Sequence, residues 1–101
     1  MIKLVSIRRV TVIADAVLEK TLLEKFESMG AHGYTLIECR GKGRHIPLPD
    51  PYTGAALVRI ELLVQPDVAD RILDYLHREV FQKYACVACT ELVDVAASDH
   101  F

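Results

Sequence analysis

The sequence predicts one α+β domain in which an antiparallel sheet of four strands carries two helices on one face. Two segments repeat apolar residues every three to four positions, as amphipathic helices do, and four others are short runs rich in Val, Ile and Leu. These segments follow one another as strand, helix, strand, strand, helix, strand. With 101 residues, the chain has room for one domain and one hydrophobic core.

The composition narrows the classes of function. The chain has 12 basic and 14 acidic residues and a formal net charge of −2, so it lacks the overall basic charge of a nucleic-acid-binding protein. Any cationic site must therefore be local. Hydrophobic residues make up 51% of the sequence, yet no apolar run reaches the ~18 residues of a membrane span. We interpret this apolar excess as a subunit interface and expect no direct membrane insertion.

The chain start and the cysteines favour a cytoplasmic protein. No secretion-signal pattern follows Met1, and three cysteines, an odd number, fit a reducing compartment better than a disulfide framework. Cys86 and Cys89 have the spacing of a metal or redox pair. In a strand, however, positions three apart point to opposite faces, and no two histidines have helical ligand spacing. We assign no metal.

The chain begins with a strand and a helix. The strand covers Ile2–Ala14; its main part is Arg9–Ala14, because two arginines interrupt the apolar pattern, and residues 2–7 form an extension or an additional edge strand. Asp15 caps the following helix, and Gly30 ends it. The inward stripe of this helix consists of Leu18, Leu22, Phe26 and Met29.

The second strand, Tyr34–Arg40, is expected to be central and buried, because it contains Leu36, Ile37 and Cys39. A long loop over residues 41–56 follows and contains Pro47, Pro49 and Pro51. Loops of this length in compact domains are usually functional or disordered, so we expect a mobile loop.

The loop begins with a basic segment that contains two glycines. Gly41 and Gly43 permit backbone conformations that a Cβ would forbid, and Lys42 and Arg44 supply positive charge. Freed backbone N–H groups beside two cations can bind a phosphate or a carboxylate. The alternative is a solvated basic turn, and the residue pattern alone leaves both interpretations open.

The second half gives a strand, a helix and a strand. The strand Leu57–Val64 places Arg59 and Glu61 on one face and Val58, Ile60 and Leu62 on the other. Pro66 suits the first turn of a helix that ends near Phe81 or Lys83. A final strand covers Ala85–Val95, and residues 96–101 form a loose tail. The helix stripe consists of Val68, Ile72, Leu76 and Val80.

This order of elements is the ferredoxin-like βαββαβ pattern, with both helices on one face of the sheet. The other face is left open. An open apolar face on so small a domain predicts association, and we expect a homo-oligomer. The same fold hosts metal carriers, RNA binders, regulators and enzymes, so the architecture alone gives no function.

Three stretches together resemble the PII signalling family across nearly the whole domain, residues 1–95. They are Gly30–Thr35, Glu38–Arg44 and Val58–Val64. The resemblance implies a homotrimer that binds adenine nucleotides between subunits and controls a transporter, enzyme or transcription factor through its mobile loop. It places Gly33, Tyr34, Thr35 and Leu63 around the adenine and ribose, and Gly41, Lys42, Gly43 and Arg44 on the phosphate side.

Departures from the family pattern narrow the expected ligand. Val80–Ala85 replaces the family's glycine-rich segment with its phosphate-binding lysine, and the paired arginines after the last strand are missing. ADP or AMP is therefore favoured over ATP. His45 replaces the glutamine of the family's 2-oxoglutarate sensors. In these features the chain is similar to the PII-like branch associated with carboxysomes and bicarbonate transport, which adds bicarbonate as a candidate ligand for the Arg44 guanidinium.

Two other classes of protein remain open. A trimeric metal-tolerance protein of similar fold would need a clustered set of His, Cys and Glu at the subunit edge, and the histidines here are scattered. A small enzyme would need a titratable pair such as His45 with Asp50 in the cleft. We expect a regulator that is not an enzyme.

Overall fold

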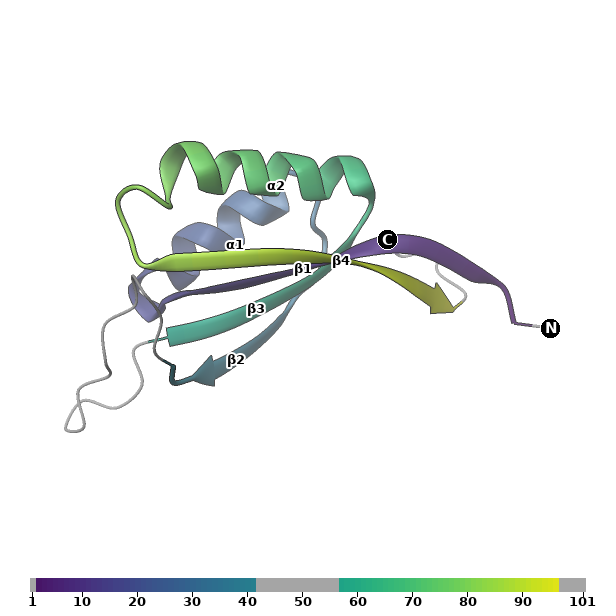
Figure 1. Cartoon of the computed structure of the whole chain (residues 1–101), viewed down its shortest axis with the longest axis horizontal. Helices are drawn as coiled ribbons and strands as arrows, with labels where there is room; N and C mark the ends of the chain where they lie inside the picture. The colour runs from purple at the N-terminus through teal and green to yellow at the C-terminus, as the bar shows by residue number, and fades with distance from the viewer. Residues whose placement is uncertain (1, 42–56, 97–101) are drawn as a thin grey trace.

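The computed structural model describes residues 2–41 and 57–96. Figure 1 shows both helices on one face of the sheet. The predicted α+β, ferredoxin-like antiparallel sheet is therefore confirmed. Lys42 and the rest of the predicted mobile loop, and the tail beyond Ala96, lie outside the described residues. The elements are β1 (Leu4–Asp15), a short 3-10 turn η1 (Ala16–Leu18), α1 (Glu19–Ser28), β2 (Thr35–Cys39), β3 (Leu57–Val64), α2 (Pro66–Glu79) and β4 (Cys86–Ala96).

The strands lie in the order β2-β3-β1-β4, and all neighbouring pairs are antiparallel. β2 is therefore an edge strand, and the prediction of a central, buried second strand was wrong. Leu36 packs against the core, but Ile37 lies on the opposite face and is 47% exposed. An apolar residue such as Ile37 is interpreted as core from sequence, because the sequence does not show whether the far face of the sheet is covered.

β1 is one unbroken strand, and Arg8 and Arg9 interrupt only its apolar pattern. Residues 4–7 continue the strand. Of the two alternatives for this segment, it is therefore an extension of the first strand and not an additional edge strand. β4 pairs with β1 over its whole length, from Ala14 opposite Cys86 to Leu4 opposite Ala96. Backbone pairing tolerates the two arginines, because their side chains can lie half-buried across the sheet surface.

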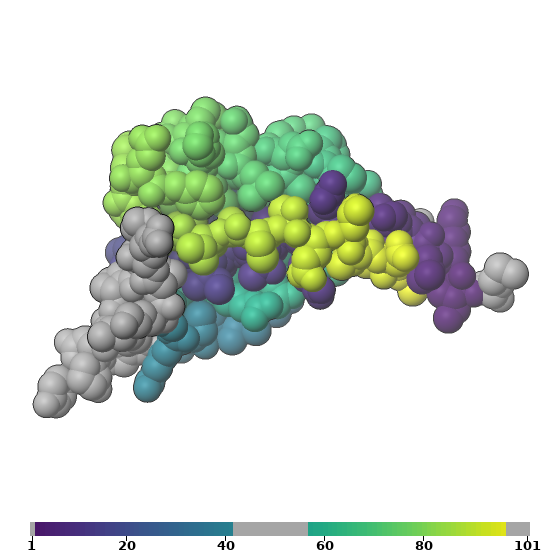
Figure 2. Space-filling model, in the orientation of Figure 1, coloured from purple at the N-terminus to yellow at the C-terminus, as the bar shows by residue number. Residues whose placement is uncertain are grey.

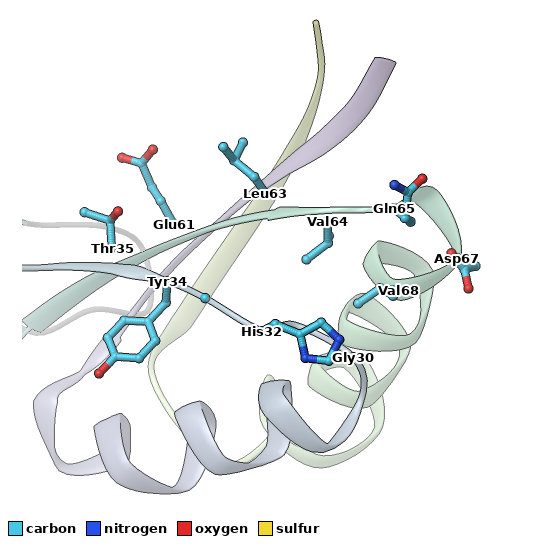
Figure 3. A pocket seen from close by; sticks show the side chains of 11 residues that line it. Gly30, His32, Tyr34, Thr35, Glu61, Leu63, Val64, Gln65, Asp67 and Val68 are labelled. Carbon is cyan, nitrogen blue, oxygen red and sulfur yellow. The ribbon is translucent and has the colours of Figure 1, made fainter. Parts of the chain in front are cut away.

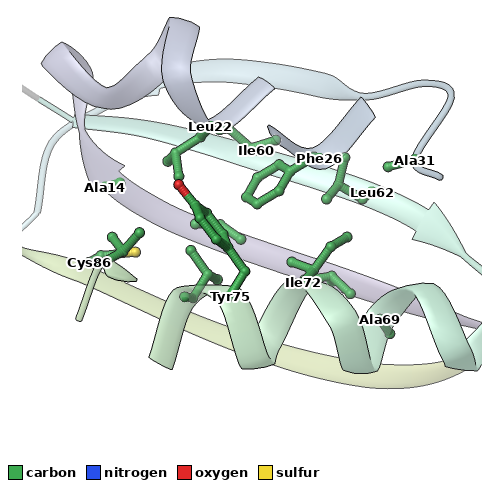
Figure 4. Packing of buried hydrophobic residues seen from close by; sticks show 14 of the residues in the cluster. Ala14, Leu22, Phe26, Ala31, Ile60, Leu62, Ala69, Ile72, Tyr75 and Cys86 are labelled. Carbon is green, nitrogen blue, oxygen red and sulfur yellow. The ribbon is translucent and has the colours of Figure 1, made fainter. Parts of the chain in front are cut away.

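The core lies between the helices and the sheet, and both predicted helical stripes face it (Figure 4). Leu22 and Phe26 of α1 and Ile72 and Leu76 of α2 are at most 1% exposed. They cover alternate residues of the two central strands, as the strand periodicity requires. The core residues of β1 and β3 are Val10, Val12, Ala14, Val58, Ile60, Leu62 and Val64, and Cys86 joins them from β4.

α2 ends at Glu79, earlier than predicted, because a tight turn closes the helix. The backbone N–H of Phe81 donates to the carbonyl of Leu76 at 2.8 Å, and that of Tyr84 donates to Val80 at 2.9 Å. Val80 is still buried, so the apolar spacing continues past the last helical residue. Periodicity therefore predicts too long a helix here.

The sheet face opposite the helices mixes apolar side chains with ion pairs. Arg9 and Glu91, opposite each other on β1 and β4, form two hydrogen bonds of 3.1 and 3.3 Å. The bond to Glu91 and its charge are the main causes of the raised pKa of Arg9. Along the same face, Ile37 and Val87 are 47% and 46% exposed. Figure 2 shows β4 lying open along one side of the molecule.

The turn after α1 depends on a left-handed glycine. Gly30 has φ +110°, its N–H donates to Glu27, and the N–H of Ala31 donates to Phe26 at 3.0 Å. This bond pattern is the Schellman C-cap, and the buried side chains of Ala31 and Phe26 fit its usual apolar contact. A Cβ on Gly30 would lie 3.2 Å from Cγ2 of Val68.

We therefore expect Gly30→Ala to lower the free energy of unfolding by about 1–3 kcal/mol, because alanine is strained at this φ and meets Val68. Urea unfolding followed by circular dichroism measures the loss. Gly33→Ala is the matched control, since no atom lies within 4 Å of a Cβ there. Equal losses in the two variants would contradict this role for Gly30.

Candidate functional site

A pocket opens where β2 separates from β3. Their ladder ends at the pair Thr35–Glu61, so the last residues of β3, Leu62–Val64, have no partner in β2. The pocket has a volume of about 620 Å³, within the range of small-molecule sites. It is lined by Gly30, His32, Gly33, Tyr34, Thr35, Glu61, Leu63, Val64, Gln65, Asp67 and Val68.

The lining comes from both sides of the sheet edge. In Figure 3, Thr35, Glu61 and Leu63 stand on the face away from the helices, whereas Val64 and Val68 lie between β3 and α2. The pocket therefore combines apolar surface with hydroxyl, carboxylate, amide and imidazole groups. An apolar wall with a few polar groups is the usual character of a ligand site.

The described part of the lining contains two carboxylates and neither lysine nor arginine. Glu61 is the more enclosed carboxylate, with a side chain 26% exposed, and Arg59 on the same strand reaches it at 3.3 Å. The Asp67 side chain is 66% exposed and pairs with Arg71. Phosphate beside these carboxylates would be repelled, so this part of the pocket suits a neutral group that donates hydrogen bonds.

Arg71 of α2 links this helix to the end of α1 on the helix side of the pocket. Its Nη2 donates to Oδ2 of Asp67 at 3.0 Å, and its Nη1 donates to the carbonyl of Met29, also at 3.0 Å. The second bond satisfies a carbonyl at the C-terminus of α1, just before Gly30. One guanidinium therefore holds α2 against the turn that leads into β2.

The pocket brings together four of the residues that the sequence predicts for a site, Gly33, Tyr34, Thr35 and Leu63. Gly41 lies beyond the far end of β2, where an added Cβ would be 3.7 Å from Leu57. The other four predicted residues lie outside the described part of the chain: Lys42, Gly43, Arg44 and His45.

Sequence reasoning missed the rest of the lining. His32 stands between the glycines of a stretch already singled out, so its position was a usable signal. The residues from Val64 to Val68 carried no sequence signal of a site, because they were assigned to the end of a strand and the start of a helix. They reach the pocket only because β3 and α2 meet beside the Gly30 turn. Those missed residues are Gly30, His32, Glu61, Val64, Gln65, Asp67 and Val68.

The segment that replaces the family's glycine-rich stretch forms the turn after α2. Its Lys83 and Tyr84 line a groove between the two helices, and neither lines the pocket at the end of β3. This segment therefore does not supply the described pocket of its own chain with a cation.

The described residues also bear on the metal and enzyme alternatives. Within residues 2–41 and 57–96, no group of three or more His, Cys, Asp or Glu side chains could hold a metal ion. Cys86 is buried and Cys89 exposed, so the prediction that they face opposite ways is confirmed. Burial raises the pKa of Cys86 to about 11, which disfavours the thiolate that metals bind. His45 and Asp50, the pair named for an enzyme, lie outside the described residues.

None of the helices in the described part of the chain is long and apolar enough to span a membrane.

Comparison with known proteins identifies the family. Residues 7–99 match the family model of the nitrogen regulatory protein P-II, and the chain belongs to that family, among its PII-like proteins. The resemblance seen in the sequence is therefore confirmed. A candidate PII-like signaling protein from Thermus thermophilus is 38% identical, with a TM-score of 0.78 over 92% of this chain and 91% of that one.

More distant solved structures share the fold. The nitrogen regulatory PII-like protein CPII from Thiomonas intermedia, bound to ADP and bicarbonate, is 20% identical, with a TM-score of 0.84 over 96% of this chain and 95% of that one. CPII bound to ADP, AMP and bicarbonate is 20% identical, with a TM-score of 0.79 over 95% of this chain and 99% of that one. No curated protein matches the sequence.

We expect Arg71→Ala to lower the free energy of unfolding by about 1 kcal/mol more than Arg78→Ala, because only Arg71 also bonds another element. Both arginines form an i,i+4 ion pair on α2, with Asp67 and Asp74, and their side chains are 58% and 57% exposed. Arg78 is therefore a close control. Equal midpoints of urea unfolding for both variants would show that the hydrogen bond from Arg71 to Met29 adds nothing to the stability of the fold.

Proposed function

We propose that this protein is a signalling regulator that binds ADP or AMP, with the nucleoside in the pocket at the end of the β2–β3 ladder. The observation that carries the proposal is the uncovered edge of β3 beside Gly33, Tyr34, Thr35 and Leu63. An unpaired strand edge offers backbone donors and acceptors in one row, which suits the hydrogen-bonding edge of a purine.

Adenine fits the chemistry of the described lining. Leu63 and Val64 offer apolar surface to the ring, and the Glu61 carboxylate can accept a hydrogen bond from the exocyclic amine. Guanine presents a carbonyl oxygen at that ring position, which would face the carboxylate unfavourably. The Thr35 hydroxyl, next to Glu61 in the ladder, can donate or accept at the base or the ribose.

The phosphates must leave the pocket away from Glu61 and Asp67, because like charges repel. In the sequence, the segment Gly41–Arg44 contains two cations and two glycines. It follows the end of β2 that is far from the pocket, so in a homotrimer a neighbouring copy would bring this segment to the pocket. We assign the phosphate end to Gly41–Arg44 on this basis, together with the family resemblance. His45 in place of glutamine argues against 2-oxoglutarate as a signal.

A diphosphate or monophosphate suits this chain better than a triphosphate. Lys83 lines the groove between the helices, and no paired arginines follow the last strand. Bicarbonate is a further candidate ligand, since CPII was solved with ADP and bicarbonate and a guanidinium such as that of Arg44 can grip a small planar anion.

We further propose that the protein acts without catalysing a reaction, in the cytoplasm, through its loop over residues 41–56. The regulated partner would be a transporter or an enzyme of inorganic-carbon or nitrogen metabolism. P-II proteins are regulators, and membership of that family supports this part of the proposal.

A homotrimer would complete the site. The pocket is open at the sheet edge, and the face next to it carries exposed Ile37 and Val87 beside the ion pairs of Arg9 and Arg59. A neighbouring copy packed on this face would cover the apolar side chains and close the pocket.

Light scattering should therefore give three times the chain mass of 11.3 kDa at micromolar concentration. Val87→Asp should release monomers, because it places a charge on the open face. Val17→Asp is the control, since Val17 precedes α1 and is 75% exposed. A stable monomer in the unmodified protein would remove both the intersubunit cleft and the nucleotide site.

Calorimetric titration should show that Arg44→Ala lowers the affinity for ADP by roughly ten- to a hundredfold, about 1.5–3 kcal/mol of binding free energy. The affinity for adenosine should change little, because adenosine has no phosphate. Leu63→Ala should lower the affinities for ADP and for adenosine by the same factor, because both ligands contain adenine. Lys42→Ala is the matched control for charge without the guanidinium fork. If Arg44→Ala leaves ADP affinity unchanged at low and physiological salt, the loop is only a solvated basic turn. Titration with AMP, ATP and Cu²⁺ tests the ligand preference and the metal alternative.

A further inference from the structure

The turn after α2 builds a second concave surface, on the helix side of the molecule. A groove of about 560 Å³ lies between α1 and α2. None of its lining residues belongs to the nucleotide pocket. It is lined by Leu18, Thr21, Leu22, Lys25, Met29, Tyr75, Arg78, Glu79, Val80, Lys83 and Tyr84. The nucleotide proposal leaves the last three residues of this set, Val80, Lys83 and Tyr84, without a function.

The groove has an apolar base and an aromatic wall. Leu18, Leu22 and Val80 are buried, at 7%, 0% and 3% exposure, and belong to the core beneath the groove. Tyr75 is 9% exposed, whereas Tyr84 keeps 47% of its surface exposed. An exposed ring beside a buried apolar base gives a side chain from another molecule a place to pack.

Positive charge predominates around this groove. Lys25, Arg78 and Lys83 line it together with one carboxylate, Glu79. Arg78 is already committed to Asp74 at 2.9 Å and lies 3.9 Å from Glu79. Within the described residues, Lys25 and Lys83 form no ion pair, and Lys25 Nζ lies 6.0 Å from the centre of the Tyr75 ring. Two ammonium groups therefore remain for a ligand.

The backbone holds these groups in place before any ligand arrives. The N–H of Lys83 and that of Tyr84 both donate to the carbonyl of Val80, at 3.0 and 2.9 Å. Val80 is anchored in the core, so the turn presents Lys83 and Tyr84 to the groove in a fixed arrangement. A preformed site loses less conformational entropy on binding than a flexible one.

We propose that this groove is a docking site for an acidic segment of a partner protein, with an apolar or aromatic side chain on the groove base and carboxylates on Lys25 and Lys83. Charge complementarity carries the choice of occupant, since the whole chain has a net charge of −2 and yet gathers cations here. A small anion would leave the apolar base and the Tyr84 ring unused. The site goes beyond the nucleotide function and does not depend on it.

The probe for the test is a fluorescein-labelled peptide with several glutamates on each side of a single phenylalanine, and anisotropy measures its binding. We expect saturable binding that weakens about tenfold or more in Lys25→Glu and in Lys83→Glu. Lys20→Glu is the matched control, because Lys20 is exposed on α1 but does not line the groove. All variants should keep the melting temperature and the ADP affinity of the unmodified protein.

Two further peptides distinguish specific docking in the groove from non-specific electrostatic attraction. A peptide with glutamine in place of glutamate, and one with alanine in place of phenylalanine, should each bind at least about tenfold more weakly. Amide shifts in the NMR spectrum should move at Lys25 and Val80–Tyr84 and stay fixed at Thr35 and Leu63.

Several results would overturn the proposal. The first is that the peptide shows no saturable binding at millimolar concentration. The second is that Lys20→Glu weakens peptide binding as much as Lys25→Glu and Lys83→Glu do. The third is that the peptide with alanine in place of phenylalanine binds with full affinity. Competition by inorganic phosphate would mean that the groove takes small anions and not a peptide.

Discussion

The left-handed turn at Gly30 is the constraint on which the pocket at the end of the β2–β3 ladder depends. It ends α1 with two backbone bonds and directs the chain back toward the sheet within a few residues. The position of this turn decides where β2 can begin to pair with β3. The ladder therefore begins only at the pair Thr35–Glu61. The pocket is the space left between the turn and the uncovered end of β3. Arg71 then holds α2 against the same turn.

A second constraint is that two helices cover only one face of the sheet. Their apolar stripes cover the core on that side, with Ile72 and Leu76 at 0% exposure, and no described helix covers the other face. That face is neither a normal solvated surface nor a core, because Ile37 and Val87 alternate with the Arg9–Glu91 and Arg59–Glu61 ion pairs.

The charges divide the molecule into regions with different chemistry. Carboxylates line the pocket at the end of the β2–β3 ladder, the cations of Lys42 and Arg44 follow β2 in the sequence, and a further cationic region lies between the helices. A chain with a net charge near zero can in this way present sites of opposite sign. Net charge therefore excludes a broad nucleic-acid surface but says little about local ligands.

The sequence by itself determined the fold class, the element order and both helical stripes, because apolar periodicity is a local property. The family followed from the resemblance of three stretches, Gly30–Thr35, Glu38–Arg44 and Val58–Val64, to a known family. This resemblance also singled out Gly33, Tyr34, Thr35 and Leu63, which the fold brings into one pocket. Only the tertiary structure decided that β2 is an edge strand, and that Gly30, Glu61 and Asp67 share a pocket. It also decided that Lys83 belongs to the groove between the helices. These outcomes depend on strand order and on the way that α2 packs beside a turn far away in the chain, and such non-local contacts leave no periodic trace in a single sequence.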